Sequence, residues 1–135
     1  MDKTESKYRD IQFYSLKNEA LMSVHSRDAR IYAGMLENDP HVVRYKCILP
    51  LDPGFMGEVS RLGIRQECFD TAWASDFWIE NEDGTTSIRE ILPRGQILKK
   101  SAIQRLELSR RYWNRLDVGD WKVVVMERGG DGDVL

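Results

Sequence analysis

The most informative pattern of apolar and polar residues lies between positions 74 and 93. Residues 76–80 read as a half-buried strand, Asp83 and Gly84 supply turn chemistry, and residues 85–92 run back with β-branched side chains. The pattern predicts a β-hairpin.

The remaining pattern predicts one small domain with strands and helices on both sides of this hairpin. In order, we expect an arm over residues 1–10, an apolar stretch over 11–16, an amphipathic helix over 18–38 that can break at the N-cap candidate Ser26, a strand over 41–49, a loop over 51–57, at least one strand within 59–73, a helix over 101–116 and a buried strand over 121–126. The fold class is therefore α/β (α+β), a mixed sheet flanked by helices. Residues 1–17 form the arm and first strand-like stretch, 18–127 the domain, and 128–135 a flexible acidic tail.

The register of the hairpin decides whether the carboxylates of Asp76 and Glu90 meet. A two-residue turn sets Phe77 opposite Glu90, whereas one extra residue bulged into the first strand brings Asp76 opposite Glu90. Side chains alternate along a strand, so Glu90 and Leu92 project to the same face. We expect a bulge near Asp76 and a carboxylate pair that can share one Mg²⁺ or Mn²⁺ ion.

The order Asp…Glu-x-Leu has the shape of the nuclease signature (P)D…(D/E)-x-K with its Lys replaced. Together, the segments ASDFWIENEDG, SIREILP and AIQRLELSRRYWNRLDVGDWKVVV resemble TnsA, the endonuclease subunit of heteromeric bacterial transposases. Upstream, SRDARIYAGMLENDPHVVRY resembles the first catalytic helix of that family. The resemblance covers residues 26–125 and implies a restriction-endonuclease-like PD-(D/E)xK fold.

At the four catalytic positions of the family, the resemblance retains two groups, Asp76 and Glu90, and loses two. Ala29 stands where the family has a helix carboxylate, and Leu92 stands where it has Lys. In that chemistry the carboxylates bind Mg²⁺ and the Lys orients and polarises the attacking water. The two losses imply a disabled or heavily altered active site. Asp28 lies ~100° round the helix from position 29 and could substitute only through a one-residue slip.

Each retained carboxylate also has a plainer role open to it. Asp76 can hydrogen-bond the backbone at a bulge, and Glu90 can be an exposed strand residue paired with Arg89 or Arg65.

The chain has a net charge of −2, so the protein as a whole is not attracted to DNA. Its charge is, however, unevenly distributed along the sequence. Basic residues gather after the hairpin, with Glu107 as the one acidic residue among them: Arg94, Lys99, Lys100, Arg105, Arg110, Arg111 and Arg115. This run is either a solvated helix face or a surface that contacts phosphates. No run approaches about 18 apolar residues, so we expect a cytoplasmic protein with no membrane partner.

Three functions remain open. We favour a TnsA-like protein of transposition, a mobile element or a phage that cleaves weakly or not at all and acts by binding DNA or a transposase partner. The second is an active Mg²⁺-dependent endonuclease whose Lys has moved to Lys46, Lys99 or Lys100, which needs two compensations at once. The third is a protein-interaction module on a reused nuclease fold. A homodimer is left open.

Overall fold

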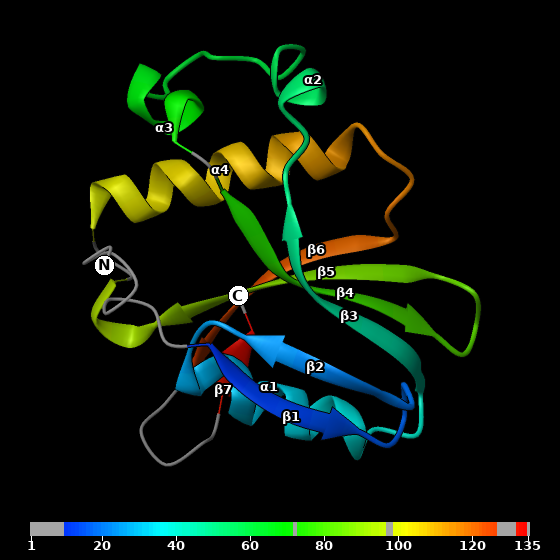
Figure 1. Ribbon diagram of the computed structural model, residues 1–135. Coiled ribbons are helices and arrows are strands. Elements are labelled where there is room, and N and C mark those ends of the chain that lie inside the picture. Colours follow the sequence, from blue (N-terminus) through cyan, green and yellow to red (C-terminus); the bar gives the residue numbers. More distant parts are fainter. Residues whose placement is uncertain (1–9, 72, 97–98, 127–131, 135) are drawn as a thin grey trace.

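The computed structural model describes residues 10–71, 73–96, 99–126 and 132–134 (Figure 1). Its elements are, in chain order, β1 Ile11–Ser15, β2 Ala20–Val24, α1 Arg27–Glu37, β3 Val42–Pro50, α2 Pro53–Met56, α3 Gln66–Asp70, β4 Ala74–Asn81, β5 Thr86–Pro93, a 3-10 turn Arg94–Gln96, α4 Lys100–Asn114, β6 Asp120–Met126 and β7 Gly132–Val134. No helix in these ranges is long and apolar enough to cross a membrane.

The main sheet has the strand order β3-β4-β5-β6-β7, and β1 and β2 form a separate two-stranded sheet. All neighbours in the main sheet are antiparallel except β5 and β6, which α4 connects as a parallel pair. Helix α1 and the β1–β2 hairpin lie on one side of this sheet, and α2, α3 and α4 lie on the other (Figure 1). The predicted fold class, a mixed sheet flanked by helices, is confirmed.

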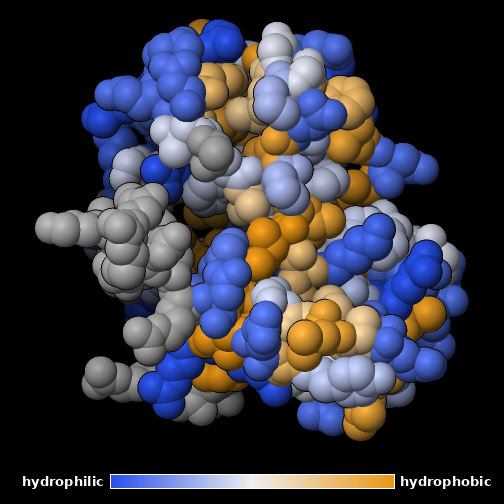
Figure 2. All heavy atoms as spheres, in the orientation of Figure 1, coloured by the Kyte–Doolittle hydropathy of each residue, from blue (hydrophilic) through white to orange (hydrophobic). Residues whose placement is uncertain are grey.

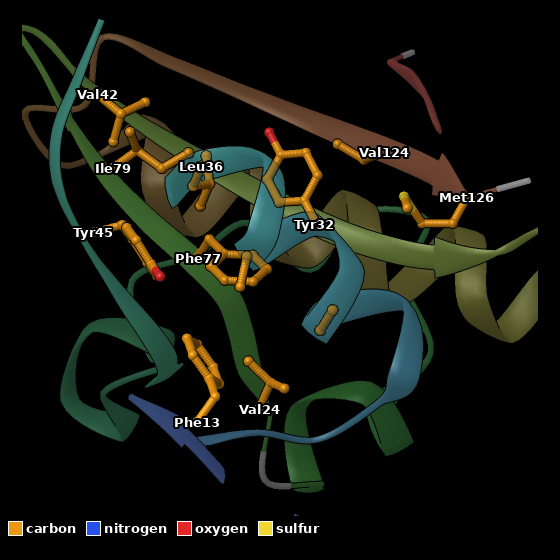
Figure 3. Packing of buried hydrophobic residues seen from close by; sticks show 12 residues of the cluster. Phe13, Val24, Tyr32, Leu36, Val42, Tyr45, Phe77, Ile79, Val124 and Met126 are labelled. Atoms are coloured by element: carbon orange, nitrogen blue, oxygen red, sulfur yellow. The ribbon is translucent and has the colours of Figure 1, made fainter. Parts of the chain in front are cut away.

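Two hydrophobic clusters fill the space on either side of the sheet. On the α1 side, Phe77 of β4 packs against Tyr32 and Tyr45, with ring centroids 5.3 and 6.2 Å away (Figure 3). On the α4 side, Leu108 and Trp113 of the helix pack on Ile88 of β5. The burial of both sheet faces explains why the central strands contain so many apolar residues.

The helix expected over 18–38 begins only at Arg27, because the chain first turns back and forms β2. Asn18 fixes this turn: its side-chain amide donates to Ser15 Oγ at 2.9 Å, and its Oδ1 accepts the Tyr45 backbone N–H at 2.9 Å. Glu19 follows with a positive φ of 53°, which breaks a helix. The predicted N-cap is confirmed, since Ser26 Oγ accepts the Ala29 N–H at 3.0 Å.

The segment between β3 and β4 also differs from expectation. A short helix, α2, replaces the loop expected over 51–57, because Asp52 caps it through Gly54 N at 2.8 Å and Pro53 suits its first turn. The strand expected within 59–73 is absent from the described residues of that range, which hold α3 and turns. Cys68 of α3 is instead buried in the α4-side cluster, so this segment covers α4 and does not join the sheet.

The C-terminal elements follow the sequence more closely. Helix α4 and strand β6 lie within about one or two residues of the predicted bounds. Helix α4 buries Ser109 and Tyr112, while the apolar Ile103 is 50% exposed. Gly132–Val134 pairs with β6 as β7, where the sequence predicts a flexible tail. Residues 1–9 of the predicted arm and 127–131 and 135 of the last segment lie outside the described residues.

Candidate functional site

The β4–β5 hairpin sets Asp76 opposite Glu90 by a different route from the predicted one. Its loop spans residues 82–84, closed by a hydrogen bond from Asn81 N to Thr85 O at 2.8 Å, with Gly84 at φ 88°. The last pair of this register is Phe77 with Arg89, and Asp76 and Glu90 stand one residue further along each strand, close enough for the Asp76 charge to act on Glu90. The extra residue that was expected as a bulge in the first strand lies in the turn. There, a three-residue loop with a left-handed Gly accommodates it at little cost.

An irregularity nevertheless occurs at Asp76. Residues two apart in a strand share a face, yet Phe77 packs on the α1 side while Ser75 Oγ donates to Glu90 Oε2 at 2.5 Å on the α4 side. Between them, Asp76 Oδ2 accepts the backbone N–H of Ile91 at 2.7 Å. The side of the sheet to which the β4 side chains point thus changes at Asp76. The Asp76 carboxylate hydrogen-bonds the backbone there, which is the plainer of the two roles that the sequence left open for it.

Glu90 is the centre of a buried hydrogen-bond network, and its side chain is 1% exposed. Its Oε2 accepts bonds from Ser75 Oγ and from Ser109 Oγ of α4. Each serine in turn accepts an indole N–H, Ser75 from Trp113 at 2.8 Å and Ser109 from Trp121 at 3.1 Å. The network joins β4, β5, α4 and β6. The alternative of an exposed Glu90 paired with Arg89 or Arg65 is therefore wrong.

Burial raises the pKa of both carboxyl groups. Glu90 rises to about 8, through burial first and then the nearby Asp76 charge, while the bonds from Ser109 and Ser75 oppose the rise. Asp76 rises to about 6, again through burial, opposed by the Ile91 N–H and by His25. The pair therefore holds a proton to higher pH than two isolated carboxyl groups would.

The carboxyl pair has only part of what a divalent metal requires. Glu90 Oε1 is buried and has no hydrogen-bond partner among the described residues, so it is an oxygen to which a cation could bind. Within those residues, however, no three His, Cys, Asp or Glu side chains gather closely enough to hold a metal. A cation here would have to displace the shared proton and take its other ligands from water, backbone or substrate.

The two positions at which the resemblance implies lost catalytic groups are packed with apolar side chains. Ala29, in the first turn of α1, is 1% exposed and belongs to the cluster around Phe77. Leu92 is 8% exposed and packs against Val125 and the partly buried Leu106. The predicted common side of Glu90 and Leu92 is confirmed, since both lie beneath α4.

The C-terminal half of α4 holds its arginines in ion pairs. Glu107 binds Arg110 and Arg111, each at 2.7 Å, and Arg110 and then Arg111 lower its pKa to about 2. Arg115 pairs with Glu58 of the segment between α2 and α3. These acidic partners reduce the positive charge that this half of the helix presents to solvent.

Arg105, in the N-terminal half of the basic run, borders an open groove. Lys99 and Lys100 are exposed at the start of α4, and Arg94 is exposed in the preceding 3-10 turn. One turn further along, the Arg105 guanidinium lies 5.2 Å from the centroid of the Trp73 ring. This half therefore keeps basic groups that could meet a phosphate backbone.

The groove has a volume of about 530 Å³ and is named here the Trp73 groove. It is lined by His25, Ile48, Pro50, Thr71, Trp73, Ala74 and Arg105. Ile48, with a positive φ of 57°, lies opposite Asp76, because the neighbouring pairs are Cys47–Phe77 and Leu49–Ser75. The groove lining thus includes Ile48, on the strand next to Asp76, and does not include Asp76 itself. Sequence reasoning missed the groove because its lining residues come from four separate segments of the chain. The one local signal is that Trp73 lies close to Asp76 in the sequence.

Comparison with known proteins gives no family for this chain. No family model matches it, and no curated protein matches it significantly.

Proposed function

We propose that this protein is a DNA-binding protein on a TnsA-like nuclease fold, belonging to a transposon, another mobile element or a phage, and that it cleaves DNA weakly or not at all. One observation carries the proposal. The hairpin brings Asp76 close enough to Glu90 for its charge to act on that carboxyl group, as the nuclease signature requires, while Ala29 and Leu92 occupy the two other expected catalytic positions as buried apolar residues.

The state of the carboxyl pair supports weak cleavage. A metal-dependent nuclease needs ionised carboxylates to hold its cation, but burial keeps a proton on Glu90 near neutral pH. Ser75 and Ser109 donate hydrogen bonds to Glu90 Oε2, and the Ile91 N–H donates one to Asp76 Oδ2. A cation would have to displace the proton on Glu90, and the cost of doing so opposes metal binding, so Mg²⁺ or Mn²⁺ would bind weakly here.

The surface beside the pair supports DNA contact. Lys99 and Lys100 are exposed, and Arg105 lines the Trp73 groove. Lys and Arg side chains that reach phosphates give binding that is independent of sequence and sensitive to salt. The C-terminal arginines of α4 contribute less, because Glu107 and Glu58 pair with them.

A protein partner is the second candidate, and a separate surface favours it. Tyr14, Leu16 and Leu21 of the β1–β2 hairpin are 59%, 79% and 66% exposed. Tyr14 pairs with Leu21 across the two strands, so these side chains form one outward apolar face. Figure 2 shows hydrophobic atoms gathered over this hairpin. A transposase subunit is the partner that the family resemblance implies.

Restoring the lost groups tests the proposal directly. The double variant Ala29→Glu with Leu92→Lys should gain plasmid cleavage in Mg²⁺ or Mn²⁺, and Asp76→Asn in that background should abolish it. The matched control is Ala29→Gln with Leu92→Met, which changes the same positions without adding charge. A thermal melt checks that the buried Lys has not unfolded the domain. If the folded double variant stays inactive, the assignment of these four positions is wrong.

A further inference from the structure

We infer that the Trp73 groove binds an unpaired nucleotide at a DNA strand end, with its base stacked on the guanidinium of Arg105. The inference rests on the proposed DNA-binding function and specifies which part of the DNA enters this groove.

The first support is a flat cationic platform. The Arg105 ζ carbon lies 5.2 Å from the centroid of the Trp73 ring, close enough for the indole to hold the guanidinium in place. Arg105 is itself exposed, whereas Trp73 is half-buried and packs on the α4-side cluster. One side of the guanidinium thus rests on protein and the side chain remains open to the groove. Arginine planes held in this way stack on bases that have left their helix.

The second support is the chemistry of the lining. Ile48, Pro50 and Ala74 supply an apolar wall suited to the faces of a base and a sugar. No carboxylate is among the described lining residues, and Arg105 offers donors to a phosphate. The Trp73 Nε1–H is a further donor, buried and without an acceptor among those residues. Apolar walls with donors and no acid suit a nucleotide.

The third support is size. A volume of about 530 Å³ falls within the range of about 300–1,000 Å³ that small-molecule sites occupy. A base can reach the Arg105 plane only by leaving its stack, and an end with no pairing partner does so at the least cost. The groove therefore selects unpaired ends over the interior of a duplex.

Fluorescence anisotropy with labelled DNA tests the inference on the full chain. Two probes are compared, a blunt duplex and the same duplex with a short single-stranded overhang. Wild-type protein should bind the overhang about tenfold more tightly, the effect of one base stacked on a platform. Arg105→Lys retains the charge but removes the plane, so it should lose the preference for the overhang over the blunt duplex. Arg115→Lys, on the same helix outside the groove, is the matched control.

A second variant keeps the test informative. Trp73→Leu removes the support beneath Arg105 and should also abolish the overhang preference, while Trp73→Phe, which retains an aromatic face, should keep part of it. Equal wild-type affinity for both probes, or a preference that survives in Arg105→Lys, overturns the inference and leaves DNA binding standing. Failure of wild-type protein to bind either probe at low salt overturns the proposed function as well.

Discussion

Ser75 of β4 donates a hydrogen bond to Glu90 of β5 at 2.5 Å, although the regular alternation of the strand would place Ser75 on the opposite face of the sheet. The change of face at Asp76 makes this contact, and with it the buried site, possible. Glu90 is therefore held by hydroxyl groups where the nuclease signature would have a metal ligand.

The raised pKa of Glu90 predicts that the protein loses stability as pH rises. The folded state retains a proton up to about pH 8, whereas an unfolded Glu releases it near pH 4.5, so folding binds protons between these values. Asp76 acts in the same direction between its ordinary pKa of 3.8 and its raised pKa of about 6. The free energy of unfolding should fall between pH 5 and pH 8, by up to about 1.4 kcal/mol per pH unit for one proton. Urea unfolding across this range measures it.

Glu90→Gln is the variant that isolates this effect. It should flatten most of the pH dependence, because the neutral side chain resembles the protonated acid that the fold already holds. Glu80→Gln, the same change on β4 at a residue paired with Arg44, should leave the slope as in wild type. A wild-type slope that survives in Glu90→Gln would show that Glu90 is not the group that titrates.

Ser109→Ala should destabilise the domain by about 1–3 kcal/mol. The change removes the Ser109 bond to Glu90 and leaves the Trp121 Nε1–H without its acceptor. It should also raise the pKa of Glu90 further, because the Ser109 bond lowers that pKa. Ser101→Ala, at an exposed position of the same helix, is the control, and denaturant midpoints compare the two. Equal midpoints for both variants would mean that the network adds little to stability.

Gly84→Ala tests the loop that sets the register. Gly84 has a φ of 88°, and an L side chain there costs about 1–2 kcal/mol. Gly95→Ala, with open space around the added carbon and no positive φ, should cost less. Thermal melting separates the two variants, and a Gly84→Ala protein as stable as the control would count against the left-handed turn.

The sequence predicts the elements whose determinants are local. The hairpin, the N-cap at Ser26 and the α4 helix each follow from neighbouring residues, and all three are present. The turn at Asn18 was missed because its decisive bond reaches Tyr45, 27 residues away. Local propensity cannot show such a contact.

The burial of Glu90 could not be predicted for a related reason. Its partners are Ser75 and Ser109, 15 and 19 residues away, and they meet only because β4 changes face and α4 turns Ser109 inward. The sequence likewise shows a continuous basic run, whereas Glu58, from a distant segment, pairs with Arg115. Whether an arginine of α4 finds an acidic partner depends on which distant segment packs over the helix. The sequence of α4 itself does not encode that.

Salt dependence tests which basic groups contact DNA. Lys99→Gln with Lys100→Gln should weaken duplex binding for every sequence alike and reduce the salt slope by about 0.9 for each lost phosphate contact. Arg110→Gln with Arg115→Gln, which removes the same charge from ion-paired residues, should change the slope less. Anisotropy titrations at several salt concentrations give both slopes. A larger loss in the arginine pair would move the DNA-contacting surface to the other end of α4.

Plasmid cleavage by the wild-type protein tests the central claim most directly. Supercoiled DNA is incubated with the purified chain and Mg²⁺ or Mn²⁺, alongside an Asp76→Asn variant that reports any contaminating nuclease. The expected result is nicking that is absent, or so weak that the two proteins are hard to distinguish, while both bind the duplex. Robust cleavage by wild type that Asp76→Asn abolishes would contradict the account and establish an active nuclease.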